Sequence, residues 1–292
     1  MLKTAGRRGF NKQVRRMLSV LLTLLIVFAL FCALLYVAQD SMIFFHVDDT
    51  QSREFLRDRP GFYNIEFTAE NGKTYHGVMY RASNEKSPLI IYFGGNGESS
   101  YRHMHSMEAQ NLWPYYDGFH YLFIDYEGYG RNAGRANYRN MNEGALAVFD
   151  HTVTLPFVDS NRIVAMGFSL GTASAVYLAA NRPVAGLILL APFADGYDLY
   201  NNVIPMFFGP MRLLVRQKFP SNEFAPLVTS PVLIVASRRD EAIPFSSSER
   251  LSRLFSGNVE FVELTDARHN DIFRADGVLN RVQSFLEGIA FT

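Results

Sequence analysis

The 292-residue sequence has only one cysteine, Cys32, and no excess of charge, because 28 Lys and Arg residues balance 28 Asp and Glu residues. A single cysteine excludes an intramolecular disulfide, and its early position excludes thiolate metal sites and a cysteine nucleophile from the rest of the chain. The balanced charge and the hydrophobic content of 48% argue against intrinsic disorder and against a basic surface for nucleic acid. We therefore expect a folded protein with no nucleic-acid partner.

One long segment lacks charged residues altogether. Residues 18–38 read LSVLLTLLIVFALFCALLYVA, and as a helix they are long enough to cross a hydrocarbon core roughly 30 Å thick. Basic residues precede this segment and acidic residues follow it, which by the positive-inside rule predicts a cytoplasmic N-terminus. The charged residues concerned are Lys3, Arg7, Arg8, Lys12, Arg15 and Arg16 before the segment and Asp40, Asp48 and Asp49 after it.

A cleaved signal peptide is the alternative interpretation of this segment. Its apolar region would span about 7–15 residues and end at a small-x-small cleavage site. Both candidate sites, Tyr36-Val37-Ala38 and Phe31-Cys32-Ala33, begin instead with a bulky aromatic residue. We therefore expect an uncleaved single-pass anchor with residues 1–17 in the cytoplasm. The main body is then expected on the non-cytoplasmic side, which in a bacterium is the periplasmic face of the inner membrane.

Beyond a connector at residues 39–62, the hydrophobic pattern is typical of an α/β fold. Alternating stretches at 63–69 and 74–81, joined across Asn71-Gly72, predict a β-hairpin. Short apolar runs separated by helix-length segments then predict buried parallel strands with crossover helices. These runs cover residues 89–93, 121–126, 162–168, 185–191, 232–236 and 259–264. The expected fold is one domain over residues 63–292, with an eight-stranded, mostly parallel sheet and helices on both faces.

One connection is longer than the others. Residues 193–230 separate two predicted strands and carry many large apolar side chains. Long insertions of this kind are usually functional loops or lids. We expect a short helical cap here.

The motif Gly167-Phe168-Ser169-Leu170-Gly171 matches G-x-S-x-G. A chance match would be no great surprise, because glycine makes up about 7% of residues in proteins. The context strengthens it, since a buried strand ends directly before the motif and a small-residue helix follows. This arrangement predicts a sharp strand-to-helix turn that exposes the hydroxyl of Ser169 as a nucleophile. The alternative is an ordinary serine at a helix N-cap.

A serine nucleophile needs a base, and in this fold class the acid and the histidine follow the serine in that order. Only His269 among the seven histidines comes after Ser169, and it lies just beyond the last predicted strand. Asp240 follows the strand before that one, so it is the expected acid that orients the imidazole. Glu241 and Asp195 are alternatives for the acid, and each of these polar residues could instead be an ordinary surface residue.

An oxyanion hole requires two N–H donors aimed at one oxygen. Leu170, directly after the serine, is expected to supply one backbone donor. The second is expected from the loop after residues 89–93, where Gly95 or Asn96 could donate. This loop lacks the Lys-Ser/Thr of a phosphate-binding P-loop, and a plain glycine turn is its other interpretation.

The motifs FGGNGE (93–98), DYEGYGRNAG (125–134), GFSLG (167–171), SRRDEAIP (237–244) and ARHND (267–271), in this order, resemble the α/β-hydrolase superfamily. More narrowly they resemble its membrane-anchored Bem46-like and ABHD13-like serine hydrolases, over roughly residues 40–290. The resemblance implies a cofactor-free Ser-His-Asp enzyme of the esterase, thioesterase or peptidase type. Two positions depart from the family pattern, since Gly94 stands where a histidine is usual and Glu127 where an arginine is common.

The expected function is therefore that of a membrane-anchored serine hydrolase that needs no metal and no cofactor. Its expected substrates are small-molecule or lipid-like carboxylic esters, including acyl thioesters. Two alternatives remain open. One is a serine peptidase whose charged pocket selects a peptide terminus, and the other is an anchored binding protein without turnover. Residues that could form such a charged pocket are Glu98, Glu127, Arg131 and Arg135.

Overall fold

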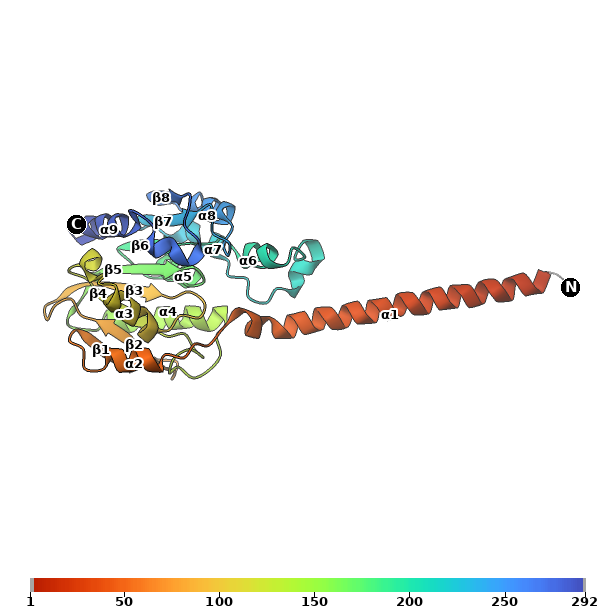
Figure 1. Cartoon of the computed structure of the whole chain (residues 1–292), viewed down its shortest axis with the longest axis horizontal. Helices are drawn as coiled ribbons and strands as arrows, with labels where there is room; N and C mark the ends of the chain where they lie inside the picture. The colour runs from red at the N-terminus through yellow and green to blue at the C-terminus, as the bar shows by residue number, and fades with distance from the viewer. Residues whose placement is uncertain (1–2, 291–292) are drawn as a thin grey trace.

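A computed structural model describes residues 3–290; residues 1 and 2 of the expected cytoplasmic segment and residues 291 and 292 of the expected hydrolase domain lie outside the described residues. The long helix α1 (Lys3–Ile43) extends away from a body of strands and helices (Figure 1). It continues past both ends of the predicted membrane segment 18–38. Its Lys12–Ser41 portion is long and apolar enough to cross a membrane, and its most apolar window is not buried against the rest of the protein.

The body is built on one eight-stranded sheet in the order β1-β2-β4-β3-β5-β6-β7-β8. β1 pairs antiparallel with β2, β2 pairs antiparallel with β4, and all other neighbours are parallel, which confirms the predicted mostly parallel sheet. The strands are β1 (Phe62–Thr68), β2 (Thr74–Tyr80), β3 (Ser87–Phe93), β4 (His120–Ile124), β5 (Val158–Phe168), β6 (Gly186–Leu190), β7 (Val232–Ser237) and β8 (Val259–Leu264).

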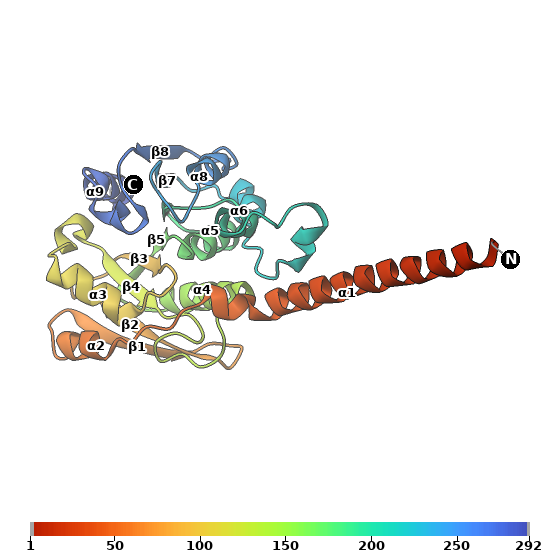
Figure 2. The same ribbon diagram turned by 45° about the vertical axis from the view of Figure 1, so that its right-hand side comes forward.

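Helices cover both faces of the sheet. α3 (Ser100–Ala109) and α9 (Val278–Ala290) lie on one side, and α4 (Tyr138–Thr152) and α5 (Gly171–Asn181) lie on the other (Figure 2). The strands β3, β4 and β6 are accordingly buried along their whole length. This double coverage explains why the strands appear in the sequence as continuous apolar runs rather than as alternating patterns.

Smaller helices occupy the connections. α2 (Thr50–Leu56) falls within the expected connector and packs on α3. The 3₁₀ helix η1 (Trp113–Tyr116) packs against α9. After β7 come α8 (Phe245–Ser252) and, beyond β8, the 3₁₀ helix η4 (His269–Arg274).

The insertion at 193–230 has two parts. Its second half forms α7 (Ser221–Phe224) and the 3₁₀ helix η3 (Ala225–Leu227), both of which pack on α5. Its first half forms α6 (Gly196–Val203) and the 3₁₀ helix η2 (Gly209–Leu214), which project beside the base of α1 (Figure 1). The short helical cap is therefore the α6–η2 segment.

The strand order determines where a site can form. β3 lies between β4 and β5, so the chain leaves β3 toward one side and returns to β5 on the other. The crevice at the carboxyl ends of strands beside such a reversal is where open α/β sheets bind ligands. The loops that follow β3 and β5 meet at this point.

Candidate active site

Ser169 occupies the turn between β5 and α5, where it adopts a left-handed backbone conformation with φ of 51°. Two glycines make this turn possible. A Cβ on Gly171 would lie 2.0 Å from the backbone oxygen of Phe93, and a Cβ on Gly167 would lie 2.7 Å from the Cα of Thr172. The turn is thus pressed against the end of β3 with no room for side chains, which fixes the position of the serine hydroxyl at the edge of the sheet.

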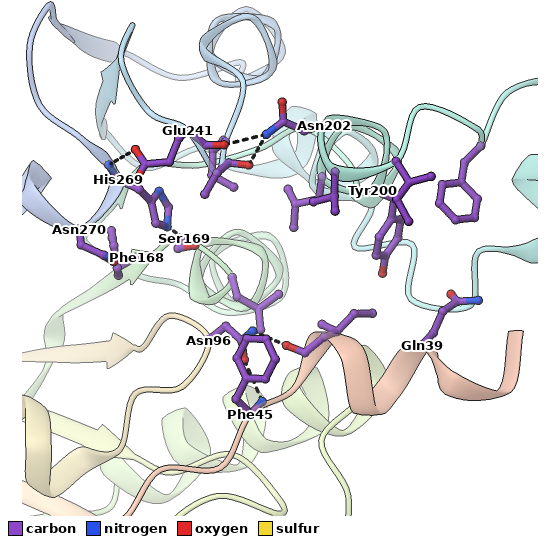
Figure 3. A pocket seen from close by; sticks show the side chains of 18 of the residues that line it. Gln39, Phe45, Asn96, Phe168, Ser169, Tyr200, Asn202, Glu241, His269 and Asn270 are labelled. Atoms are coloured by element: carbon purple, nitrogen blue, oxygen red, sulfur yellow. Dashed lines mark hydrogen bonds between the residues drawn. The ribbon is translucent and has the colours of Figure 1, made fainter. Parts of the chain in front are cut away.

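Three side chains from separate loops meet at this turn. The Nε2 atom of His269 lies 2.9 Å from the Oγ atom of Ser169, and its Nδ1 atom lies 2.8 Å from a carboxylate oxygen of Asp240. Asp240 follows β7, and its other oxygen accepts hydrogen bonds from the backbone N–H groups of Ala242 and Ile243. His269 begins η4 after β8. The structure therefore joins serine, imidazole and carboxylate in one hydrogen-bonded series, as Figure 3 shows for the serine and the histidine.

The inner members of this series are shielded from solvent. The side chain of Asp240 is 2% exposed and that of His269 is 11% exposed. The ring of Phe168 stacks on the imidazole with a centroid distance of 5.1 Å. Since a paired carboxylate in a site with little water interacts strongly with a cation, this setting favours an imidazolium that forms transiently.

The two alternative acids have other partners. Glu241 accepts a hydrogen bond from the backbone N–H of His269 and pairs with Arg268, so it contacts the histidine without reaching the ring. Asp195 caps α6 and forms an ion pair with Arg250 at 3.1 Å. The geometry therefore distinguishes Asp240 from both.

Two backbone N–H groups lie at the edge of the cavity without acceptors. Among residues 3–290, no hydrogen-bond acceptor is found for the N–H groups of Leu170 and Asn96, and both residues line the same cavity as Ser169. The side chain of Asn96 is held in place by Tyr129, whose hydroxyl donates to it at 2.9 Å, and by the backbone N–H of Phe45 at 3.2 Å. This leaves its backbone N–H as a free donor.

Gly95 requires a correction. We expected either Gly95 or Asn96 to donate to an oxyanion, but the Gly95 N–H already donates to the Oε2 atom of Glu98 at 2.6 Å. The hydroxyl of Tyr92 donates to the same carboxylate oxygen at 2.9 Å. The sequence could not reveal this bond, because it depends on how the loop closes on itself.

Phe123 and Glu98 together explain the glycine at position 94, where the family usually has histidine. A Cβ on Gly94 would lie 2.4 Å from the Phe123 ring and 3.0 Å from the Glu98 carboxylate, so a histidine does not fit here. Burial tends to raise the pKa of Glu98, but the imidazole of His103 and the hydrogen bonds from Gly95 and Tyr92 outweigh it, so the pKa lies below its usual range. An ionised Glu98 therefore organises the loop.

The cavity beside Ser169 has a volume of about 510 Å³ and is lined mostly by apolar side chains. Figure 3 shows its walls, which come from three parts of the chain. The end of β5 contributes Phe168, the loop after β7 contributes Ile243, and the cap contributes Leu199 and Phe207. The third wall comes from α1, a contribution that our sequence analysis missed, and includes Leu35, Gln39 and Ile43.

Other polar candidates lie away from this cavity. Glu127 pairs with Lys73 at 2.8 Å and accepts a hydrogen bond from Asn140 at 3.1 Å, and these contacts make it part of the framework. The hydrogen bond with Glu127 raises the pKa of Lys73 to about 12.

Within the described part of the chain, no three His, Cys, Asp or Glu side chains are grouped so that they could hold a metal ion.

Comparisons with known proteins agree with this architecture. Residues 93–257 match the model of the alpha/beta hydrolase family, a stretch that includes Ser169 and Asp240. The chain is 32% identical over 231 residues to an uncharacterized protein of Mycobacterium tuberculosis, which covers 78% of this chain and 80% of that protein. It is 29% identical over 174 residues to an alpha/beta hydrolase domain-containing protein of Caenorhabditis elegans, covering 58% of this chain and 51% of that one.

A solved structure of an esterase from Pyrococcus furiosus superposes with a TM-score of 0.66 at 16% identity, covering 84% of this chain and 97% of the esterase. At 16% identity, this similarity shows the fold only. The family match and the mycobacterial relative go further, since each extends over more than half of the chain. The chain belongs to the α/β-hydrolase family.

Proposed function

We propose that this protein is a membrane-anchored serine hydrolase that cleaves carboxylic esters through an acyl-enzyme intermediate. The observation that carries the proposal is the position of His269, with Nε2 at 2.9 Å from the Ser169 hydroxyl and Nδ1 at 2.8 Å from Asp240. A serine hydroxyl is a weak nucleophile unless an adjacent base removes its proton, and that base works best when a third group orients it. The geometry supports these three roles.

In the first half of the reaction, the Oγ atom of Ser169 attacks the ester carbonyl carbon while its proton passes to Nε2 of His269. The carbonyl oxygen becomes an oxyanion that accepts hydrogen bonds from the N–H groups of Leu170 and Asn96. Asp240 holds the Nδ1–H and stabilises the imidazolium. The tetrahedral intermediate then collapses, its bond to the leaving oxygen breaks, and Nε2 protonates the departing alcohol. The acyl group remains on Ser169.

The second half uses the same groups with water in place of the serine. His269 removes a proton from water, and the hydroxide attacks the acyl carbon. The oxyanion forms again at the same two N–H groups. Its collapse breaks the bond to Ser169, whose Oγ regains the proton from Nε2, and the carboxylic acid leaves. Neither half requires a metal or a cofactor.

The cavity favours an ester with an apolar acyl group over a peptide. Pockets that bind small molecules are typically about 300–1,000 Å³ and mostly apolar with a few polar groups, and the cavity at Ser169 fits that description. A peptidase that selects a peptide terminus would need charged groups to hold that terminus. None of Glu98, Glu127, Arg131 and Arg135 lines this cavity, and Glu241 is the only carboxylate among its lining residues in the described chain.

We infer the location from α1. The helix Lys12–Ser41 supports a single-pass anchor, with the basic N-terminal segment in the cytoplasm and the hydrolase domain on the other side of the membrane. In a bacterium, this proposed topology corresponds to the periplasmic face of the inner membrane.

Activity-based labelling in intact membranes tests the proposal. A fluorophosphonate probe should label the wild type but not Ser169→Ala, and His269→Ala should label far more slowly. Protease added from outside should digest the hydrolase domain of spheroplasts and leave the N-terminal segment. Labelling of Ser169→Ala at the wild-type rate would contradict the serine assignment. A folded wild type that never labels would favour the anchored binding protein.

A further inference from the structure

The anchor helix forms part of the substrate cavity. Leu35, Gln39 and Ile43 are spaced four residues apart on α1, so they share one face of the helix, and all three line the cavity that contains Ser169. An anchor that only tethered the enzyme would have no reason to contribute to this wall. α1 therefore has a role beyond attachment.

Specific hydrogen bonds hold α1 against the cap. The side chain of Gln39 donates to the backbone oxygen of Leu214 at 2.6 Å and accepts from the backbone N–H of Arg216 at 2.9 Å. Next to it, the side chain of Gln217 donates to Asp40 at 2.8 Å. Figure 3 shows Gln39 at the edge of the cavity, on the side where the cap approaches α1. These contacts fix the height of the cap along the helix.

In the proposed topology, that height coincides with the surface of the membrane. The uncharged run of α1 ends at Ala38, and Asp40 follows. Leu35 lies three residues before Ala38, which at the helical rise places it roughly 4.5 Å inside the apolar run. One wall of the cavity therefore reaches the depth at which hydrocarbon begins.

The cap carries exposed apolar side chains at the same level. Val203 is 78% exposed, Phe208 60% and Leu213 84%, and all belong to the α6–η2 segment that lies beside the base of α1 (Figures 1 and 2). We call these three residues the cap rim. Two exposed basic residues are close to the rim in sequence, Arg212 directly before Leu213 and Lys218 five residues after it. Apolar and aromatic side chains bordered by basic ones are typical of a surface that lies in the headgroup region of a bilayer.

We propose that the cap rim rests in the membrane leaflet nearer to the hydrolase domain, so that the cavity opens toward the bilayer and takes a long-chain acyl ester sideways from the membrane. This inference rests on the proposed esterase activity and names its substrate class. The acyl chain lies along the wall formed by Leu35 and Ile43, with its carbonyl at Ser169. We assign a lipid rather than a protein as the partner of the cap rim, because the rim lies beside a helix that is long and apolar enough to span a membrane.

The test uses the full-length protein reconstituted in phosphatidylcholine vesicles and two substrates with one leaving group. 4-Methylumbelliferyl palmitate is supplied within the bilayer, and 4-methylumbelliferyl butyrate is supplied in water. In the double variant Phe208→Asp/Leu213→Asp, we expect the palmitate-to-butyrate rate ratio to fall at least about tenfold, because two large apolar side chains no longer favour contact with lipid. Neither residue lines the cavity, so the butyrate rate should stay within about twofold of wild type.

Leu227→Asp is the matched control. Leu227 is 60% exposed like Phe208, but it precedes β7. It therefore lies toward the amino-terminal ends of the parallel strands, whereas the active site lies at their carboxyl ends. We expect this variant to keep the wild-type ratio. If the rim double variant and Leu227→Asp give the same palmitate-to-butyrate rate ratio, the proposal that the cap faces the membrane is wrong.

Leu35→Trp tests the α1 wall separately. An indole in the cavity should shorten the preferred acyl chain, so that turnover of palmitate falls at least about tenfold while butyrate is still hydrolysed. An unchanged chain-length profile would contradict the role of α1 in substrate binding. Failure of the proposed function would look different, because a wild type that hydrolyses neither ester, or a Ser169→Ala variant that hydrolyses both, would be seen in the butyrate measurement alone.

Discussion

The carboxylate of Glu98 accepts the backbone N–H of Gly95 at 2.6 Å, one residue before the amide that we assign to the oxyanion hole. This bond turns the Gly95 N–H away from catalysis and sets the direction of the peptide that follows. In the proposed reaction Glu98 is thus a positioning residue, because it would act only through the loop that it holds.

Glu98→Ala should lower kcat by roughly tenfold to a hundredfold, less than the loss of about 10²–10³ that removal of an oxyanion donor itself causes. KM for a short ester should change little, because Glu98 does not line the substrate cavity. Glu98→Gln keeps an oxygen acceptor for Gly95 and should restore part of the rate. If the kcat of Glu98→Ala equalled that of wild type, the positioning role of Glu98 would be contradicted.

Gly94→Ala should destabilise the protein, and Gly94→His should do so more strongly. The added Cβ would meet the Phe123 ring at 2.4 Å, and overpacking of this kind typically costs about 1–3 kcal/mol. Thermal unfolding of the detergent-solubilised protein measures the effect. A Gly94→His variant as stable as wild type would show that the loop can adopt the histidine-containing form of the family without penalty.

The two adjacent acids should respond differently to loss of charge. Asp240→Asn should reduce kcat on the order of 10³–10⁴-fold, because an amide cannot hold the imidazole tautomer that accepts the serine proton. Glu241→Gln should stay within a few-fold of wild type, since Glu241 reaches only the backbone of His269. The two variants differ in position by a single residue, so each is the control for the other. Equal losses would contradict the assignment of the acid.

Asp125 should make stability depend on pH. Its carboxylate is buried and accepts two hydrogen bonds from Ser100, and burial raises its pKa from an ordinary 3.8 to about 6. Folding therefore favours the protonated form, so the stabilisation is present below pH 3.8 and is lost as pH rises through 6. Relative to Asp125→Asn, the wild type should lose about 2 kcal/mol of unfolding free energy between pH 4 and pH 7. Denaturant unfolding of both proteins at several pH values measures this difference. If the unfolding free energies of wild type and Asp125→Asn changed equally with pH, the assignment would be contradicted.

The sequence predicted those parts of the structure that depend on local pattern or on chain order. Buried strands appear as apolar runs, and Ser169 is recognisable because its turn requires glycines at fixed positions. The pairing of His269 with Asp240 followed from their places after successive strands, since parallel strands bring their carboxyl ends to one edge of the sheet.

The sequence could not predict features that depend on single long-range bonds. Whether Gly95 or Asn96 has a free N–H for the oxyanion depends on the carboxylate of Glu98, which accepts the N–H of Gly95. The contribution of α1 to the cavity depends on hydrogen bonds from Gln39 to residues more than 170 positions away. A polar residue at the end of an apolar helix gives no signal of such a partner.

The measurement that tests the account most directly is the site of covalent modification. Wild-type protein treated with a fluorophosphonate and digested should carry one adduct, on the Ser169 hydroxyl, and formation of this adduct should be lost in Ser169→Ala and strongly slowed in His269→Ala. An adduct on a different residue, or unchanged labelling after loss of His269, would contradict the claim that this histidine activates this serine.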